Sequence, residues 1–374
     1  MDVAVIGIGG TGSAALRFLA KAGHSATGFE QFTIGHTRGS SHGESRVIRY
    51  LYADPLYTAL IRDAYPLWQD LERSSKERLL VKTGGIFLDK EGSSEIERTI
   101  ASLEENQCPY QLLTPDQVHQ RYPAFHVDKG EVALFQADTG FLRSSACVKA
   151  NVRIARANGA VIHEETHVTA VQQLGKHVKI TTANGVDQIF DRVIVTAGAW
   201  MASLLRDVGL PLVVSRQYVT YLDTPERGHS RYTLGSFPIW IDTGSEDLFY
   251  GFPNDGVLPG IKISTHALGP AVDQSEIPPK EAPKEWLDKV REYAIHRFPK
   301  ISGKVLQSIP CLYTNAPNED FMLDKVQESI WMVSGCSGHG FKFTVLLGKI
   351  AAELATGGCY NRDISRFALS GKRG

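Results

Sequence analysis

A glycine-rich turn beside the N-terminus determines which folds this chain can adopt. Residues 2–6 are an apolar run typical of a buried strand, and the turn Gly7-Ile8-Gly9-Gly10-Thr11-Gly12 follows at once. Residues 13–22 have a helical pattern closed by Gly23, and a second strand-like run ends at Glu30. Strand, turn, helix, strand and terminal acid therefore occur in the order of a βαβ unit.

Each glycine of this turn has a separate physical purpose. Gly7 permits the tight turn, Gly9 lets a pyrophosphate approach the backbone, and Gly12 lets the helix pack closely on the strand. Glu30 stands about 20 residues further on, where its carboxylate can accept a hydrogen bond from a ribose hydroxyl. The unit predicts a dinucleotide site, but by itself it does not distinguish NAD from FAD.

Two further segments indicate that the nucleotide domain is discontinuous. Residues 191–197 are an apolar strand that enters a small-residue turn at Gly198, and residues 329–334 precede a glycine-rich turn and a helix. NAD dehydrogenases usually keep their nucleotide unit contiguous, whereas FAD proteins of the glutathione-reductase type split theirs. The pattern favours FAD, and two independent α/β units are the alternative.

The intervening segments predict a second layer of structure. Strand-like runs at 213–222, 247–252 and 260–265, with a helical pattern at 283–298, suit a mainly antiparallel sheet. We therefore expect an α/β (α+β) fold with a split Rossmann-type FAD-binding domain and an antiparallel-sheet substrate domain. The FAD-binding domain is expected at 1–80, 141–210 and 315–374, and the substrate domain at 81–140 and 211–314.

Composition excludes several classes of partner. The formal net charge is -1 over 374 residues without a long basic run, which argues against nucleic acid and anionic membranes. No apolar run reaches the roughly 20 residues of a membrane span, and the start MDVAVIGIG lacks the basic residues of a secretory signal. Five widely spaced cysteines form no zinc-like cluster. A reduced, cytoplasmic protein without a metal is expected.

Two polar segments contain residues that a fold does not need. In the segment 39–49, Arg46 and Arg49 follow a Gly/Ser-rich loop and can direct guanidinium groups at an anion, although a solvated helix start has the same composition. In the segment 260–266, Lys262 and His266 share one face of an alternating strand. The alternative is that both side chains lie on the solvent-facing side of an edge strand.

Two more segments lie nearer the C-terminus. Cys311 occurs in a strand-like run, where a lone cysteine is usually a core hydrophobe. Lys342 follows small residues at a helix start, which suits the close approach of a ligand, but it could equally be a solvated helix lysine.

Together the four segments resemble the monomeric sarcosine oxidase and N-methyltryptophan oxidase family, FAD-dependent amine oxidases of the D-amino-acid oxidase superfamily. The resemblance extends from residue 3 to about residue 356. Its specific motifs are GSSHGESRVIR, YGFP with GIKISTH, CLYT, and SGHGFKF.

The resemblance implies three sets of site residues. The catalytic set is Lys262, Arg46, His266 and Tyr313. The substrate-binding set is Arg49, Lys342, Tyr250 and Ile241. With the glycine-rich turn included, the cofactor-binding set is Gly7, Gly9, Gly12, Glu30, Ser40, His42, Arg46, Val168, Gly198, Cys311, Gly338, Gly340 and Lys342.

The resemblance also implies particular roles for these side chains. Cys311 resembles the cysteine bonded through sulfur to the 8-methyl carbon of FAD, and Lys262 resembles the lysine that activates oxygen. Arg49 and Lys342 resemble the pair that holds the substrate carboxylate. No metal is required.

The implied reaction is oxidation of a secondary amine that bears a carboxylate, with oxygen reduced to hydrogen peroxide by a monomeric enzyme. Three departures from the family pattern concern the amine that is oxidised. Ser41 replaces a histidine, the loop between Tyr250 and Lys262 is slightly longer than usual, and Ile241 stands where a flexible methionine is usual. The alternatives are a fructosyl amino acid or a pipecolate-like cyclic imino acid as substrate, a dehydrogenase with another electron acceptor, and a non-catalytic flavin-binding protein.

Overall fold

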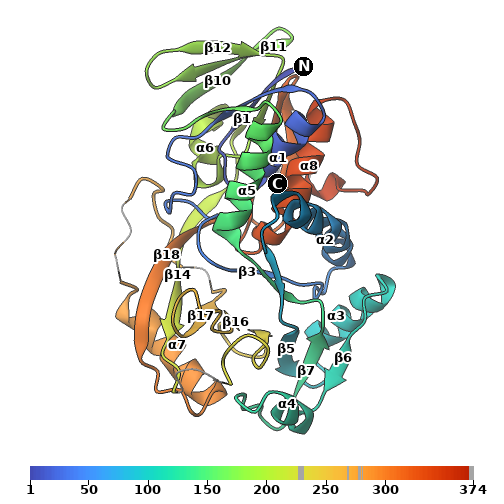
Figure 1. Ribbon diagram of the computed structural model, residues 1–374, viewed down its shortest axis with the longest axis vertical. Coiled ribbons are helices and arrows are strands. Elements are labelled where there is room, and N and C mark those ends of the chain that lie inside the picture. Colours follow the sequence, from blue (N-terminus) through green and yellow to red (C-terminus); the bar gives the residue numbers. More distant parts are fainter. Residues whose placement is uncertain (226–230, 268, 277–278, 280, 370–374) are drawn as a thin grey trace.

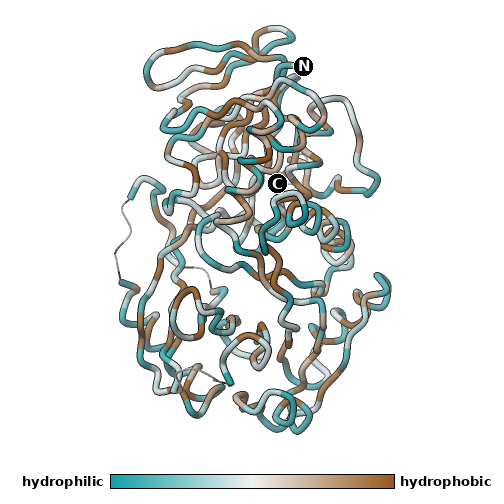
Figure 2. The backbone as a smooth tube through the Cα atoms, in the orientation of Figure 1, coloured by the Kyte–Doolittle hydropathy of each residue, from teal (hydrophilic) through white to brown (hydrophobic). Residues whose placement is uncertain are grey.

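The computed structural model describes residues 1–225, 231–267, 269–276, 279 and 281–369 (Figure 1). Two large sheets organise these residues, one in the upper half of the view beside the N-terminus and one in the lower half. Hydrophobic backbone segments are concentrated in the central strands and helices of both halves (Figure 2). No described helix is long and apolar enough to cross a membrane.

The upper sheet has six strands in the order β19-β20-β13-β1-β2-β9. All neighbours are parallel except β19 and β20. The strands are β1 (Asp2–Ile6), β2 (Ser25–Phe29), β9 (Val161–His163), β13 (Arg192–Val195), β19 (Met322–Gln327) and β20 (Ile330–Ser334). Segments from the two ends and the middle of the chain share one sheet, so the alternative of two independent α/β units is wrong.

Both faces of this sheet are covered. Val3 and Val5 point to the side where four helices pack, whereas Ala4 and Ile6 point to the opposite side, where a small sheet and a short helix lie. The four helices are α1 (Gly10–Lys21), α2 (Pro55–Ser75), α5 (Ser144–Ala157) and α8 (Thr344–Ala355). The small sheet is β10 (Val168–Leu174), β11 (His177–Thr182) and β12 (Asp187–Phe190), with helix α6 (Met201–Leu204) beside it.

The first helix begins earlier than its sequence pattern predicts. Helix α1 starts at Gly10, three residues before the expected 13–22 segment, because the small residues of the turn already adopt helical backbone angles. Two other helices begin at residues typical of helix starts. Helix α5 begins at Ser144, and α4 (Pro115–Arg121) has a complete capping box between Thr114 and Gln117.

The lower sheet has eight strands in the order β18-β14-β17-β16-β15-β5-β7-β6. Every neighbouring pair is antiparallel except β15 and β5, which confirms the expected mainly antiparallel sheet. The strands are β5 (Gly85–Lys90), β6 (Gln111–Leu113), β7 (Glu131–Gln136), β14 (Val213–Leu222), β15 (Ile239–Asp242), β16 (Phe249–Phe252), β17 (Ile261–Thr265) and β18 (Val305–Asn315).

Alternation along β17 decides which side chains face the protein interior between the sheets. Ile261 and Ile263 pack in the same cluster as helix α7 (Lys284–Arg297), which covers one face. Lys262 therefore points to the opposite face, the side that carries Phe252 and Ile241. Helix α3 (Ser94–Glu105) packs on that second face through Ile96.

A small antiparallel sheet lies where the chain crosses between the large sheets. It contains β3 (Arg46–Ile48), β8 (Gly140–Leu142) and β4 (Leu80–Lys82). The division into domains is our proposal, and its boundaries at 80/81 and 140/141 fall within β4 and β8. Within the proposed ranges, residues 226–230, 268, 277–278, 280 and 370–374 lie outside the described residues. The short 3-10 helices are Gly198–Trp200, Arg206–Val208, Gly340–Phe343 and Ser365–Phe367.

Candidate active site

The glycine-rich turn leaves no room for side chains. Gly7 has φ +86°, and a Cβ atom there would lie 2.7 Å from the backbone oxygen of Thr196. A Cβ on Gly12 would collide with the backbone oxygen of Gly7. A Cβ on Gly9 would lie 3.0 Å from Ser41 Oγ. The close packing explains why glycine occupies all three positions.

The turn also presents polar groups suited to a dinucleotide. The first intrahelical hydrogen bond of α1 runs from Ser13 N to Gly9 O at 3.0 Å, so the preceding N–H groups have no helical acceptor. Such groups attract phosphate. The buried Glu30 carboxylate accepts hydrogen bonds from Ile8 N at 2.9 Å and Phe32 N at 3.1 Å, and it retains lone pairs for a ribose hydroxyl. The N–H donors of the turn and the Glu30 acceptor therefore fit the pyrophosphate and the ribose of FAD.

The Gly/Ser-rich loop lies between this turn and the lower sheet. Ser40 Oγ donates to the backbone oxygen of Leu312 in β18 at 2.6 Å, and Arg46 Nη2 donates to Ser40 O at 3.1 Å. Gly10 N donates to Ser41 Oγ at 2.9 Å. The loop is thereby joined both to the start of α1 and to β18.

His42 lies in the same loop and is 5% exposed. Burial lowers the pKa of its imidazole to about 3, and the positive charges of Arg46 and Lys262 act in the same direction. Its Nε2 atom is buried and has no hydrogen-bond partner among the described residues. A buried unsatisfied nitrogen of this kind is best explained by a polar ligand, which again fits a bound flavin.

Lys262 is the most deeply buried cation of the predicted catalytic set, at 3% exposed. Its Nζ donates to the backbone oxygen of Ser45 at 2.7 Å and to Ser45 Oγ at 3.1 Å, and it lies 4.3 Å from the centre of the Phe252 ring. Burial holds the pKa of this amine well below its usual range, and Arg46 lowers it further. The solvent-facing alternative for Lys262 is therefore wrong.

Cys311 lies in the middle of β18, opposite Gln217 of β14, and is 7% exposed. Burial raises the pKa of its thiol, while the charges of Arg46 and Lys262 oppose that rise. Cys336 occupies the glycine-rich turn after β20 and acts on Cys311 electrostatically. Both thiols therefore lie in the same region of the molecule.

Two predicted substrate-binding cations, Arg49 and Lys342, lie close enough for the charge of Arg49 to act on Lys342. Burial lowers the pKa of both, and the charge of Arg49 lowers that of Lys342 further. Tyr52 connects them: the Arg49 guanidinium lies 4.0 Å from the Tyr52 ring centre, and Lys342 Nζ donates to Tyr52 Oη at 2.9 Å. Within the described residues, neither cation forms an ion pair with a carboxylate.

His266 lies close enough to this pair to be affected by both charges, and Tyr313 and Tyr250 continue from His266. Tyr250 Oη and Tyr313 Oη lie 3.2 Å apart, and the rings of Tyr313 and His266 are 5.8 Å apart. Burial lowers the pKa of His266 to about 4, with Arg49 and Lys342 contributing, so its imidazole is neutral near pH 7. Ile241 pairs with Tyr250 across β15 and β16.

Glycine again permits close approach at the turn after β20. Gly338 has φ +74°, and a Cβ there would collide with the Tyr313 ring and lie 2.6 Å from His266 Cε1. A Cβ on Gly340 would lie 2.8 Å from Cys336 Cβ. The structure thus brings Tyr250, Tyr313, His266 and Gly338 together.

Two residues of the predicted cofactor set lie apart from these contacts. Val168 is buried at the start of β10, in a cluster with Phe29 and Phe190. Gly198 is exposed at the start of a 3-10 helix, with φ +53° and open space where a Cβ would be. For these two, the contacts within the chain show packing and turn formation only.

Sequence reasoning overlooked two residues of the site. Tyr52 contacts both Arg49 and Lys342, and Ser45 accepts both hydrogen bonds of Lys262. Ser45 could have been selected because it precedes Arg46 in the Gly/Ser-rich loop. Tyr52 follows Arg49 in an irregular segment whose spacing carries no signal.

Known proteins with similar sequences and folds give the context of this site. A family model described as FAD dependent oxidoreductase matches residues 2–354. The monomeric sarcosine oxidase of Streptomyces avermitilis is 31% identical over 372 residues, which cover 98% of this chain and 96% of that protein. The N-methyl-L-tryptophan oxidase of Yersinia pestis is 30% identical over 377 residues, which cover 99% and 98%.

Solved structures agree on the fold. The L-proline dehydrogenase of P. horikoshii matches with a TM-score of 0.84 at 20% identity, covering 98% of this chain and 96% of that one. The fructosyl amine:oxygen oxidoreductase of Aspergillus fumigatus matches with a TM-score of 0.80 at 16% identity, covering 98% and 89%. At such identities the likeness concerns the fold alone, and it confirms the expected fold class.

Proposed function

The chain belongs to the FAD-dependent oxidoreductase family, and from this premise we propose that it oxidises secondary amines that bear a carboxylate, such as N-methyl amino acids. The family resemblance inferred from the four polar motifs is thereby confirmed. The substrate class is supported by the relatives' names and by the cations beside His266 and Tyr313.

The observation that carries the proposed substrate class is the pairing of Arg49 with Lys342. Lys342 is 4% exposed and Arg49 is half-buried, and neither forms an ion pair with a carboxylate among the described residues. An unpaired buried charge is costly, so such a pair is best explained by an anionic ligand. A substrate carboxylate held there would fix which end of the amine is presented for oxidation.

FAD supplies the redox chemistry when it is bound. The side chains around it have positioning and electrostatic tasks. A neutral His266, together with Tyr250 and Tyr313, would surround the amine nitrogen, and the glycine turn would hold the pyrophosphate. With sarcosine as the substrate, oxidation would give an imine, and water would hydrolyse the imine to glycine and formaldehyde. Oxygen would be reduced to hydrogen peroxide.

We propose Lys262 as the residue that makes the enzyme an oxidase. Negative charge develops on oxygen as it is reduced, and a preorganised cation in a dry pocket stabilises such charge strongly. The burial of Lys262 and its two hydrogen bonds to Ser45 support this role. A dehydrogenase with a different electron acceptor is the alternative.

Covalent attachment of FAD through Cys311 is part of the same proposal. It is supported by the CLYT motif and by the charges of Arg46 and Lys262, which oppose the rise that burial causes in the pKa of the Cys311 thiol. We also propose a cytoplasmic, monomeric protein. The cytoplasmic location is supported by the five cysteines, none of which forms a disulfide in the structure. The monomeric state rests on the family resemblance and is tested by size-exclusion chromatography with light scattering.

A peroxide-release screen tests the proposed function. Sarcosine, larger N-methyl amino acids, pipecolate and fructosyl amino acids would each be incubated with the enzyme in air. The proposal expects peroxide with one or more N-alkyl amino acids. If every amine reduces the enzyme anaerobically but none yields peroxide, the dehydrogenase alternative replaces the oxidase.

A further inference from the structure

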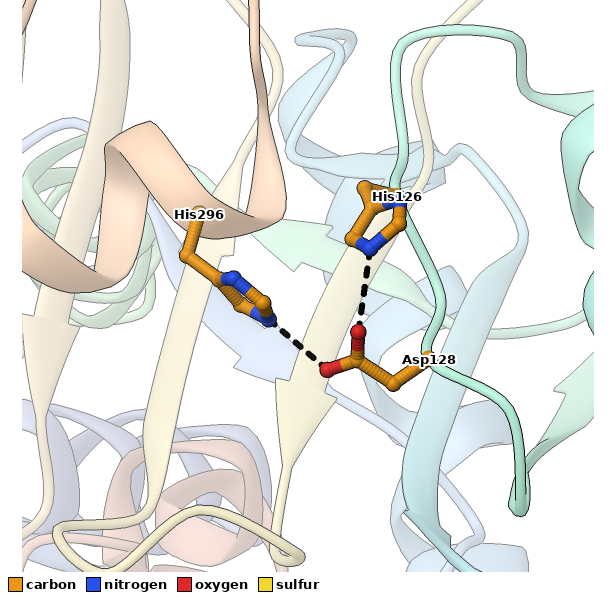
Figure 3. A group of neighbouring side chains, drawn as sticks. All are labelled: His126, Asp128 and His296. Carbon is orange, nitrogen blue, oxygen red and sulfur yellow. Dashed lines mark hydrogen bonds and ion pairs between the residues drawn. The ribbon is translucent and has the colours of Figure 1, made fainter.

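Three side chains outside the proposed active site point toward one another (Figure 3), two of them exposed and one half-exposed. His126 Nε2 lies 3.0 Å from Asp128 Oδ1, and His296 Nε2 lies 2.7 Å from Asp128 Oδ2. The two imidazole rings are 5.4 Å apart, and one ligand atom from each of the three residues falls within 4.8 Å of the others. Two imidazoles and one carboxylate therefore face a common centre.

The backbone beneath these side chains is fixed by pairing between distant segments. His126 N donates to the backbone oxygen of Arg297 at 2.8 Å, and Arg297 Nη1 donates to His126 O at 2.8 Å. Since His296 directly precedes Arg297 at the end of α7, this pairing holds the two imidazoles at neighbouring positions. Asp128 N donates to Glu131 Oε2 at 2.8 Å, which fixes the third member.

Arg297 anchors this arrangement in the core. Its side chain is 3% exposed and forms ion pairs with Glu131 at 2.7 Å and with Asp242 at 2.7 Å. The same Glu131 carboxylate accepts the hydrogen bond from Asp128 N. The backbone that carries His126, Asp128 and His296 is thus held by a buried network of ion pairs. Rotation of the three side chains is enough to turn them toward a ligand. Preorganisation of this kind lowers the cost of binding a ligand.

We propose that His126, Asp128 and His296 form a binding site for one divalent transition-metal ion of the Zn²⁺ type. Zinc takes imidazole nitrogen at about 2.0–2.1 Å and carboxylate oxygen at about 2.0–2.2 Å, so two of its ligand atoms are at most about 4.4 Å apart. The three ligand atoms lie within 4.8 Å of one another, and small side-chain rotations would bring them onto one ion. Imidazole ligands favour Zn²⁺, Ni²⁺ and Cu²⁺ over Ca²⁺ and Mg²⁺. The exposed position leaves a fourth ligand site for water.

The ion would connect the end of α7 to the segment that precedes β7. Asp128 and His296 are 168 residues apart in sequence, so the ion would close a long loop. It would stabilise the lower sheet without taking part in the redox reaction, which is proposed to proceed at Lys262 and requires no metal. The competing interpretation is a surface hydrogen-bonded trio, in which Asp128 only accepts from two imidazoles.

Isothermal titration of the metal-free holoenzyme with ZnCl₂ separates the two interpretations. One zinc per chain is expected, with the affinity lowered at least about tenfold by His126→Asn or His296→Asn and binding lost in the double variant. His177→Asn is the matched control, since His177 is equally exposed and lies 3.4 Å from Asp191 without a second imidazole. CaCl₂ should give no binding at this site.

Thermal unfolding and zinc-edge X-ray absorption complete the test. Zinc should raise the unfolding midpoint of the unaltered enzyme and leave that of the double variant unchanged. The absorption spectrum should show nitrogen and oxygen ligands alone. The proposal is overturned if no zinc binds, if the double variant binds it as tightly, or if sulfur ligation places the ion at the exposed Cys359. The flavin spectrum of each variant verifies its fold.

Discussion

Lys262 Nζ donates a hydrogen bond to the backbone oxygen of Ser45 at 2.7 Å, across 217 positions of sequence. This contact joins β17 of the lower sheet to the Gly/Ser-rich loop that reaches the glycine turn of α1. Lys262 therefore has a fixed position relative to both Arg46 and the cofactor-binding turn. The direction of its pKa shift, downward through burial and through Arg46, follows from the same placement.

This geometry separates the two halves of the proposed reaction. A buried cation does little for the removal of hydrogen from a neutral amine but stabilises the charge that forms as oxygen is reduced. Loss of one such preorganised group typically costs about 100- to 1,000-fold in rate. We expect Lys262→Met to slow reoxidation of the reduced enzyme by that factor, and anaerobic reduction by substrate much less, in stopped-flow traces.

Lys304→Met provides the control for this experiment, because Lys304 is exposed and pairs with Asp223 at the surface. It should leave both half-reactions unchanged. Unaltered reactivity toward oxygen in Lys262→Met would remove this residue from the proposed mechanism and favour the dehydrogenase alternative.

Cys311 and Cys336 offer two candidate attachment points for FAD. If Cys311 is the anchor, acid-precipitated enzyme should remain yellow, and Cys311→Ser should release free FAD on denaturation. Cys336→Ser should keep its flavin bound, which makes it the matched control. A flavin-bearing proteolytic peptide that contains Cys336 would contradict the assignment, as would flavin that washes off the unaltered protein.

Much of the fold was predictable because local patterns encode it. The turn at Gly7–Gly12 requires backbone without side chains, and the apolar runs that became β1, β13 and β20 mark buried parallel strands. The 21-residue helix α2 was overlooked, although Asp54 caps it and Pro55 occupies its first position. The same signal, a capping residue followed by proline, begins α4, so the omission of α2 was avoidable.

The site was predictable in composition but not in contacts. Motifs selected Lys262, Arg49 and Lys342, yet the partners Ser45 and Tyr52 depend on tertiary packing across 217 and 290 positions. No periodicity reports such long-range contacts. Burial was equally unpredictable for Lys262, since an alternating strand has the same pattern whether its polar face meets water or the protein interior.

Removing one of the paired cations should weaken substrate binding. Truncating one member of a buried charge pair costs about 2–4 kcal/mol, so Arg49→Ala should lower kcat/KM about 30- to 700-fold. The neutral methyl ester of a good substrate should be nearly inert with the unaltered enzyme. Arg62→Ala is the control, because Arg62 is exposed on α2. An ester oxidised as fast as the acid would show that Arg49 and Lys342 serve another purpose.

The stability of the fold should depend on pH through His42. In the native protein, burial and the charge of Arg46 lower the pKa of this imidazole to about 3, whereas in the unfolded chain it titrates near about 6.5. Because the folded pKa is the lower one, the unfolded chain binds the proton first. The stabilisation is therefore complete above about pH 6.5 and is lost as the pH falls toward 3.

Urea unfolding at pH 7 and pH 5 measures this contribution. When the pH is lowered from 7 to 5, protonation of His42 in the unfolded chain should lower the free energy of unfolding by about 2 kcal/mol. The free energy of unfolding should therefore fall by that much less in His42→Gln than in the unaltered enzyme. His177→Gln is the control, since His177 is exposed and its loss should leave the difference unchanged. Equal pH sensitivity in His42→Gln and the unaltered enzyme would mean that His42 carries a proton in the native protein, and its place beside Arg46 and Lys262 would then require a compensating anion.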